Sequence, residues 1–424
     1  MTPSMAKVEM KDSGVSWVGP IPKTWDMRRT KFLFSLAQRL PHPEDGIVTA
    51  FRDGQVTLRS NRRTDGFTNA LKEAGYQRVQ KGDLVIHAMD AFAGAIGVSD
   101  SDGKCTPVYS CCVPNHDASA EFYARCVRTM ATTGYVESLA KGIRERSTDF
   151  RWATFAEQLL PHPPKAEQDA IVAHLDRATS RIDAMVAQKT RFIELLREKR
   201  QALITHAVTK GLDPNVQMKD SGVEWLGEVP ETWDTAPLKS FLQLRRDIVG
   251  SESSNTKLLS LTLQGVIERD LENPRGKMPA SFDGYQRISA GEMVFCLFDM
   301  DETPRTVGVA PQDGMLTGAY TVFRPQGELW ARYLYYFFLH VDEYKRLRPF
   351  YKGLRKTIRP GPFLSIQVPR PTEREAKAIV ADLDSATTRI DTLISKTERS
   401  IELLREHRTA LITAAVTGKV DLSI

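Results

Sequence analysis

The sequence predicts an α+β protein built from two similar halves in tandem, each a small α/β domain followed by one long helix. Blocks of the first half recur in the second at a constant offset, which is the signature of an internal duplication. The repeated block at the end of each half has apolar residues at coiled-coil spacing. A chain of 424 residues is also longer than a single hydrophobic core usually serves, since cores stop growing near roughly 250–300 residues. We therefore expect two domains and two helices, paired as an antiparallel coiled coil with pseudo-twofold symmetry.

Each half opens with the same short block. Residues 10–15, Met-Lys-Asp-Ser-Gly-Val, recur at 218–223, an offset of 208 residues. Trp25 and Trp233, each in a Thr-Trp-Asp triplet, follow at the same offset. These blocks indicate a duplicated scaffold.

A second block repeats at this offset and predicts the helices. Each follows prolines, at Pro163-Pro164 and at Pro371, and ends near a glycine, Gly211 or Gly418. A run from Lys165 to about Val208 would be roughly 66 Å long at 1.5 Å per residue, which is too long for a helix inside one small domain. The expected seam residues are Ile171, Leu175, Ala178, Ile182, Met185, Lys189, Phe192 and Leu196 in the first helix, and Ile379, Leu383, Ala386, Ile390, Leu393, Thr397, Ser400 and Leu404 in the second.

Between these blocks the two halves have diverged. Residues 31–161 and 239–369 share only landmarks, such as Tyr-Gln-Arg at 76–78 and 285–287, and Gly-Ile-Arg at 142–144 against Gly-Leu-Arg at 353–355. Buried strands are predicted after Gly82 and Gly291, and an aromatic-rich helix over Leu329–Lys345. The expected division is 1–161 as the first domain, 162–211 as the first helix, 212–369 as the second domain and 370–424 as the second helix.

Catalytic motifs are missing from the sequence. No Gly-rich loop has the spacing of a nucleotide-binding loop, and residues 213–216, Asp-Pro-Asn-Val, lack the second proline and the aromatic residue of an amino-methyltransferase motif. Asp299, Asp301 and Glu302 suit a solvated loop better than a metal site. No catalytic set, metal site or bound cofactor is expected in this chain.

The cysteines and the hydropathy pattern carry little further information on function. Cys105, Cys111, Cys112, Cys126 and Cys296 have no metal-ligand spacing and are interpreted as free buried thiols. With no signal peptide or membrane-spanning segment evident, we expect the protein in the cytoplasm.

Positive charge gathers in turn-rich segments of both diverged domains. The net charge is only +5, but arginine and lysine in loops suit phosphate contacts, and arginine and asparagine also read base edges. A solvated basic face is the alternative interpretation. The candidate DNA-binding residues are Arg59, Asn61, Arg62, Arg63, Arg144, Arg146 and Arg151 in the first half, and Arg245, Arg246, Lys352, Arg355, Lys356 and Arg359 in the second.

The repeated blocks resemble the specificity subunit of type I restriction-modification systems. The resemblance rests on the Lys-Asp-Ser-Gly-Val-x-Trp opening at 11–17 and 219–225, the Gly-x-Arg turn, and the helix that contains Glu-Leu-Leu-Arg-Glu at 194–198 and 402–406. It covers nearly the whole chain, including the order of its parts.

The resemblance implies a non-catalytic subunit with two target-recognition domains, each of which reads one part of a split, asymmetric DNA sequence. It further implies two methyltransferase subunits that dock on the helices and methylate adenine N6, and restriction or motor subunits that join the full complex. S-adenosylmethionine, ATP and Mg²⁺ would belong to those partners. Two alternatives stay open: an enzyme with degenerate motifs, and a coiled-coil scaffold that does not bind DNA.

Overall fold

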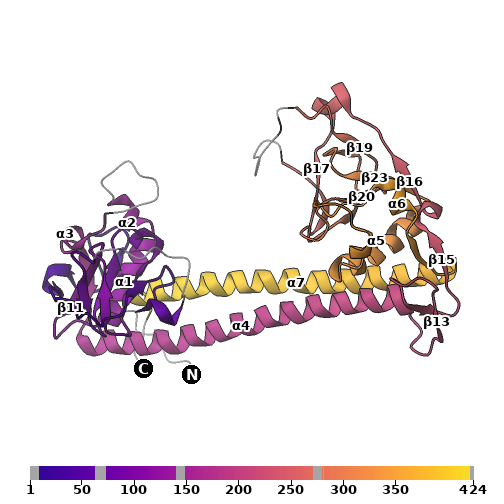
Figure 1. Ribbon diagram of the computed structural model, residues 1–424. Helices are drawn as coiled ribbons and strands as arrows, with labels where there is room; N and C mark the ends of the chain where they lie inside the picture. The colour runs from indigo at the N-terminus through magenta and orange to yellow at the C-terminus, as the bar shows by residue number, and fades with distance from the viewer. Residues whose placement is uncertain (1–8, 63–72, 140–148, 271–278, 280, 421–424) are drawn as a thin grey trace. The chain divides into compact units, whose positions relative to one another are not determined.

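A computed structural model describes residues 9–62, 73–139, 149–270, 279 and 281–420. The chain forms two compact units, Met1–Lys189 with Arg399–Ile424 (unit 1) and Thr190–Glu398 (unit 2). Each unit combines one mixed domain with portions of the two long helices, α4 (Lys165–Lys210) and α7 (Glu373–Val416) (Figure 1). Each helix thus contributes to both units.

The mixed domain of unit 1 is built on a four-stranded antiparallel sheet with the order β4-β11-β8-β9. These strands are β4 (Phe34–Leu36), β11 (Tyr109–Pro114), β8 (Leu84–His87) and β9 (Ile96–Val98). The two-stranded pairs are β1 (Met10–Asp12) with β2 (Pro20–Pro22), β3 (Asp26–Arg29) with β12 (Leu159–His162), β5 (Val48–Ala50) with β6 (Val56–Leu58), and β7 (Gln77–Val79) with β10 (Gly103–Cys105). The helices are α1 (Ala120–Thr132), α2 (Tyr135–Ser138) and α3 (Trp152–Phe155).

Unit 2 has the same arrangement of strands, with the sheet order β16-β23-β20-β21. These strands are β16 (Leu242–Arg245), β23 (Thr321–Pro325), β20 (Met293–Phe295) and β21 (Val307–Val309). The pairs are β13 (Met218–Asp220) with β14 (Glu228–Pro230), β15 (Asp234–Pro237) with β24 (Gln367–Arg370), β17 (Leu259–Thr262) with β18 (Gly265–Glu268), and β19 (Gln286–Ile288) with β22 (Gly314–Leu316). Its helices are α5 (Glu328–Glu343) and α6 (Pro360–Leu364).

The two strands and the one helix predicted inside the diverged domains are present. β8 and β20 follow Gly82 and Gly291 and are almost wholly buried, while α5 covers most of the predicted aromatic helix. Tyr333, Phe337 and Phe338 of α5 lie in the core of unit 2. Since burial of large aromatic side chains dominates core energetics, α5 anchors its sheet to the rest of the unit.

The duplicated opening block ties each domain to the start of its helix. The Trp25 indole Nε1 donates a hydrogen bond of 2.9 Å to Glu167 Oε1, and the Trp233 Nε1 donates one of 3.3 Å to Glu375 Oε1. Both indoles are buried, and both glutamates lie in the first turn of a long helix. Each copy of the opening block therefore makes the same contact between its domain and the first turn of its long helix.

In each unit, portions of α4 and α7 lie side by side and run in opposite directions (Figure 1). Arg408 Nε lies 2.9 Å from Asp183 Oδ1 in unit 1, and Arg200 Nε lies 3.1 Å from Asp391 Oδ1 in unit 2. These two ion pairs use equivalent positions of the duplication, since Arg408 and Asp391 lie 208 residues after Arg200 and Asp183. The helices pair as an antiparallel coiled coil.

Most of the expected seam positions are covered. Ile171, Leu175, Ile182, Leu196, Ile379, Leu383 and Ile390 are buried, and Met185 and Leu404 are half-buried. Both helices end at a glycine in the left-handed region, Gly211 at φ 75° and Gly418 at φ 70°. Only glycine adopts this conformation without a steric penalty, so the predicted helix ends have a direct backbone cause.

Two expected seam residues need correction. Phe192 and Leu393 are 45% and 40% exposed, whereas their neighbours are better covered: Ile193 is only 6% exposed and Ile394 is half-buried. A strict seven-residue pattern drifts by about 20° per heptad on a straight α-helix, so the packed face moves to the neighbouring residue. Ile182 and Ile193 are eleven residues apart, which matches the spacing of about 3.67 residues per turn.

All five cysteines are free and buried. Cys105 Sγ and Cys111 Sγ are 3.5 Å apart, and this hydrogen bond, together with burial, raises the pKa of Cys111. The thiols therefore act as small core side chains. Across the described parts of the chain, no helix has both the length and the hydrophobicity required for a membrane span.

Candidate nucleic-acid interface

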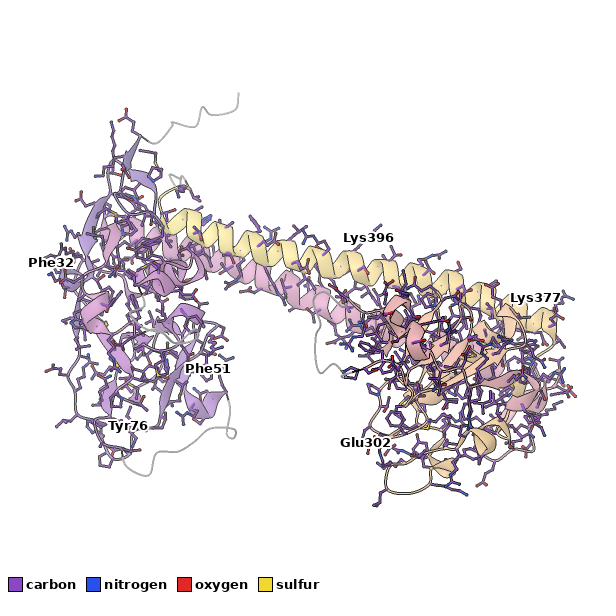
Figure 2. The ribbon with its side chains drawn as sticks, turned by 90° about the horizontal axis from the view of Figure 1, so that it is seen from above. Phe32, Phe51, Tyr76, Glu302, Lys377 and Lys396 are labelled. Carbon is purple, nitrogen blue, oxygen red and sulfur yellow. The ribbon has the colours of Figure 1, made fainter. Side chains whose placement is uncertain are left out.

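The candidate residues of unit 1 lie around a 3₁₀ turn, Arg59–Asn61, that follows β6. Arg62 is exposed and forms an ion pair of 2.7 Å with Asp53, and its guanidinium lies 4.1 Å from the ring centroid of Phe51, which is labelled in Figure 2. The Asn61 amide donates to Thr57, and the Arg59 Nε donates to Thr49. The turn is therefore held in one conformation by its own side chains.

The other four candidate residues of unit 1 do not belong to this turn. Arg151 is exposed and pairs with Asp149 at 2.6 Å. Arg63, Arg144 and Arg146 lie outside the described residues. Arg59, Asn61 and Arg62 are thus the described candidates of unit 1 that lie together.

Arg245 and Arg246 are adjacent in sequence but lie in different environments. Arg245 Nε is 3.4 Å from Glu292 Oε1, a carboxylate that is 4% exposed, and Arg245 also pairs with Asp247 at 3.1 Å. A buried carboxylate needs cations and hydrogen bonds to offset its desolvation, so Arg245 has a structural role that it shares with Arg324, whose Nε donates to Glu292 Oε1 at 3.2 Å. Arg246 is exposed and has no ion pair among the described residues.

Lys352 and Arg359 resemble Arg246 in this respect. Both side chains are exposed, and neither pairs with a carboxylate among the residues that the structure describes. The charge of such a cation is not neutralised by a carboxylate of the protein, so it is available to an anionic ligand. Arg246, Lys352 and Arg359 are therefore the best candidates of unit 2 for direct phosphate contacts.

Arg355 and Lys356 belong to a turn that faces an acidic loop. Arg355 Nη2 lies 2.6 Å from Asp299 Oδ2, and Lys356 Nζ lies 2.9 Å from Asp301 Oδ2 and 2.6 Å from Glu302 Oε1. The hydrogen bond from Arg355 lowers the pKa of Asp299, and those from Arg348 and Lys356 lower the pKa of Asp301. Glu302 lies at the surface of unit 2 (Figure 2). Exposed ion pairs add little net stability, so a phosphate can compete for these cations.

An aromatic pair, missed by sequence reasoning, lies beside these cations. The rings of Phe298 and Tyr320 are stacked, with centroids 6.1 Å apart and planes 18° apart. The Arg355 guanidinium lies 5.3 Å from the Phe298 ring centroid, while Tyr320 and Arg246 line one hollow of about 310 Å³. Partly exposed aromatic rings next to arginine suit nucleic acid. No sequence pattern joins positions 298 and 320, because the fold brings them together.

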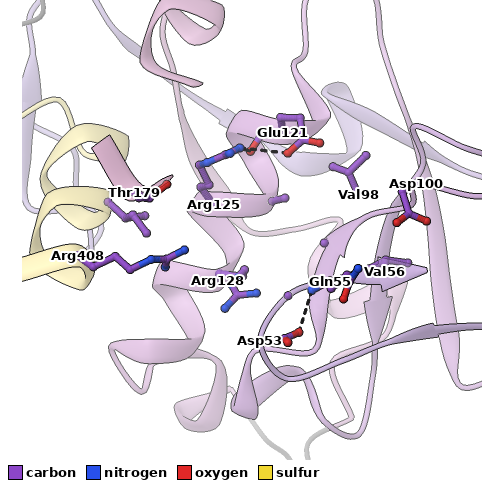
Figure 3. A pocket seen from close by; sticks show the side chains of 14 residues that line it. Asp53, Gln55, Val56, Val98, Asp100, Glu121, Arg125, Arg128, Thr179 and Arg408 are labelled. Carbon is purple, nitrogen blue, oxygen red and sulfur yellow. Dashed lines mark hydrogen bonds and ion pairs between the residues drawn. The ribbon is translucent and has the colours of Figure 1, made fainter. Parts of the chain in front are cut away.

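A second feature without a sequence signal is an arginine-lined pocket of about 300 Å³ in unit 1 (Figure 3). Arg125 pairs with Asp176 and Arg408 with Asp183, but Arg128 has no ion pair among the described residues. Burial and the charge of Arg408 lower the pKa of Arg128. A Cβ at Gly54 would lie 1.1 Å from Arg128 Nη1 and would displace that guanidinium, and the left-handed φ of 91° favours glycine there. The pocket places one unpaired guanidinium where an anion can reach it.

Comparison by sequence finds no matching family model and no matching curated relative. Solved structures do match. One is a chain of a type I restriction-modification system studied for its complex assembly and conformational transition, with a TM-score of 0.68 at 14% identity over 94% of this chain and 99% of the other. Another is the HsdS subunit from Thermoanaerobacter tengcongensis, with a TM-score of 0.54 at 15% identity over 94% and 98%. The likeness is one of fold and extends over almost the whole chain.

Proposed function

We propose that this chain, which has the fold of an HsdS subunit, is the non-catalytic specificity subunit of a type I restriction-modification complex. The observation that carries the proposal is the structural match over 94% of this chain and 99% of the other, with a TM-score of 0.68. A match of this extent includes both domains and both helices. Because fold alone does not determine function, binding of DNA by this chain is the property to measure.

The two mixed domains would each read one part of a split, asymmetric DNA target. Their shared strand order supports equivalent roles, and the divergence of residues 31–161 from 239–369 supports different target sequences. Exposed cations lie on loops of both domains, around Arg62 in unit 1 and around Arg246 and Lys352 in unit 2. Loops held on a rigid sheet are the usual carriers of binding residues.

The helix pair would position two methyltransferase subunits for adenine N6 methylation and would support restriction in the full complex. Leu195 and Leu403, equivalent positions of the duplication, are 46% and 49% exposed, as expected for two copies of one docking surface. S-adenosylmethionine, ATP and Mg²⁺ would be bound by those partners. This chain would supply geometry and sequence recognition.

DNA binding by the full chain, measured as a function of salt, tests the proposal. Each phosphate contact contributes a slope of about −0.9 to the dependence of log K on log salt. We expect Lys352→Ala to reduce the slope by about one unit. Lys396→Ala, which removes the same charge from an exposed position of α7 (Figure 2), should leave it unchanged.

The alternatives predict different results. A coiled-coil scaffold would bind a duplex no better than a neutral polymer, at any salt concentration. An enzyme would show turnover of DNA by the isolated chain. Equal slopes for Lys352→Ala and the unaltered chain would remove Lys352 from the interface.

A further inference from the structure

The most exposed large apolar side chain of the described residues is Leu354, at the tip of a basic turn in unit 2. Its relative exposure is 103%, and it belongs to none of the hydrophobic clusters. A single exposed leucine is ordinary on a protein surface. Three features set this one apart: the rigidity of the turn, the charges around it and the recurrence of its sequence.

The turn that carries Leu354 is fixed at its base. Lys352 and Thr357 exchange two backbone hydrogen bonds of 3.0 Å, and Lys356 N donates to Gly353 O at 3.1 Å. Gly353 and Lys356 have left-handed φ angles of 71° and 44°. Since such a conformation is unfavourable for lysine, the surrounding contacts must hold it in place.

The neighbouring loop supplies those contacts. Asp299 N donates to Arg355 O at 2.8 Å, and Ile358 N donates to Leu297 O at 3.0 Å. The side chains of Arg355 and Lys356 are tied to carboxylates of the same loop. The leucine therefore projects from a preorganised turn, and presenting it to a ligand costs little conformational entropy.

The residues that flank Leu354 suit a polyanion. Lys352 is exposed and has no ion pair among the described residues, while Arg355 lies over the ring of Phe298. An apolar tip between cations has the chemistry of a side chain that enters the base stack while its neighbours bind phosphates. A protein partner with an apolar pocket would need acidic groups around that pocket.

The triplet around Leu354 also recurs in the first half. Gly353-Leu354-Arg355 corresponds to Gly142-Ile143-Arg144, which lies outside the described residues. The surrounding segments share little else, so a glycine, a large aliphatic residue and an arginine were retained while the rest diverged.

We propose that Leu354 is a wedge that inserts between two neighbouring bases at one step of the DNA sequence read by unit 2. This inference rests on the proposed function. The insertion unstacks that step and bends the duplex there. Because pyrimidine–purine steps unstack most easily, the wedge adds sequence preference at a position where no base edge is hydrogen-bonded.

The test uses the full chain and its target duplex with 2-aminopurine placed at successive steps, since the fluorescence of this base rises when it loses its stacking partner. We expect a rise at one step with the unaltered chain. Leu354→Ala should abolish the rise and weaken affinity roughly sixtyfold, because it removes three buried carbons and each changes affinity by about fourfold. Leu354→Met should retain both properties.

Leu263→Ala is the matched control. Leu263 is an exposed leucine on another hairpin of unit 2, between β17 and β18, and its replacement should change neither fluorescence nor affinity. Binding without a fluorescence rise at any step, or an unchanged rise with Leu354→Ala, would overturn the wedge while leaving the proposed function intact. Failure of the unaltered chain to bind any duplex would overturn the proposed function itself.

Discussion

At the scale of single residues, charge alone does not identify a DNA contact. Arg245 and Arg246 look alike in the sequence, yet Arg245 neutralises the buried Glu292 and Arg246 faces solvent. Glu292 lies 47 residues away in the sequence, so no local pattern shows the pairing. Long-range pairing partners decide which arginines remain available to a ligand.

His340 gives a pH dependence that can be measured. Its Nδ1 lies 3.1 Å from Thr205 Oγ1 and its Nε2 lies 3.3 Å from an Arg346 nitrogen, so α5 is joined to α4. Burial and the charge of Arg346 lower the pKa of His340 to about 4. The unfolded chain, with a pKa near 6.5, therefore binds a proton that the folded chain excludes.

The contribution of His340 is fully present above about pH 6.5 and is lost as the pH falls toward 4. His340→Gln should make the free energy of unfolding fall less steeply between these values, by on the order of 3 kcal/mol in total. Urea unfolding at several pH values measures this slope. If the free energy of unfolding changed with pH in the same way for both proteins, the lowered pKa of His340 would be contradicted.

At the scale of elements, the duplication made the two long helices predictable, and a glycine before a buried run predicted the strands β8 and β20. Apolar spacing, prolines at the start and Gly211 or Gly418 at the end define each helix within a few residues. The finer register was not predictable, since Phe192 and Ile193 are both apolar and only packing separates them. Ion pairs such as Asp183–Arg408 join residues that the sequence places 225 positions apart.

The proposed function also predicts that the length of the helix pair sets the gap between the two parts of the DNA target, and insertions in the helices test this. Inserting seven residues after Lys189 and seven after Glu398 keeps the seam in phase and adds about 10.5 Å to each helix. The gap between the two parts of the DNA target should lengthen by about three base pairs, at 3.4 Å per base pair, with both parts unchanged. A single insertion in one helix should disrupt the pairing and lower stability.

Selection of bound duplexes from a random-sequence library measures the gap for each chain. An unchanged gap in a variant that folds and binds DNA would show that the helices do not set the spacing.

At the scale of the whole molecule, the architecture could be predicted and most of the interface could not. Repeats are visible in a single sequence, so two mixed domains and two paired helices followed from them. The stacked pair Phe298–Tyr320 and the Arg128 pocket required coordinates, because their residues come from separate elements.

The central claim is that this chain selects the DNA sequence at which partner subunits act. Mapping of modified bases across the genome, in cells with the cognate methyltransferase subunit and with or without this chain, tests it most directly. The account predicts one split motif with an N6-methyladenine on each strand, present only with the chain. Methylation that is unchanged without the chain, although the complex assembles when it is present, would contradict the claim and favour a scaffold.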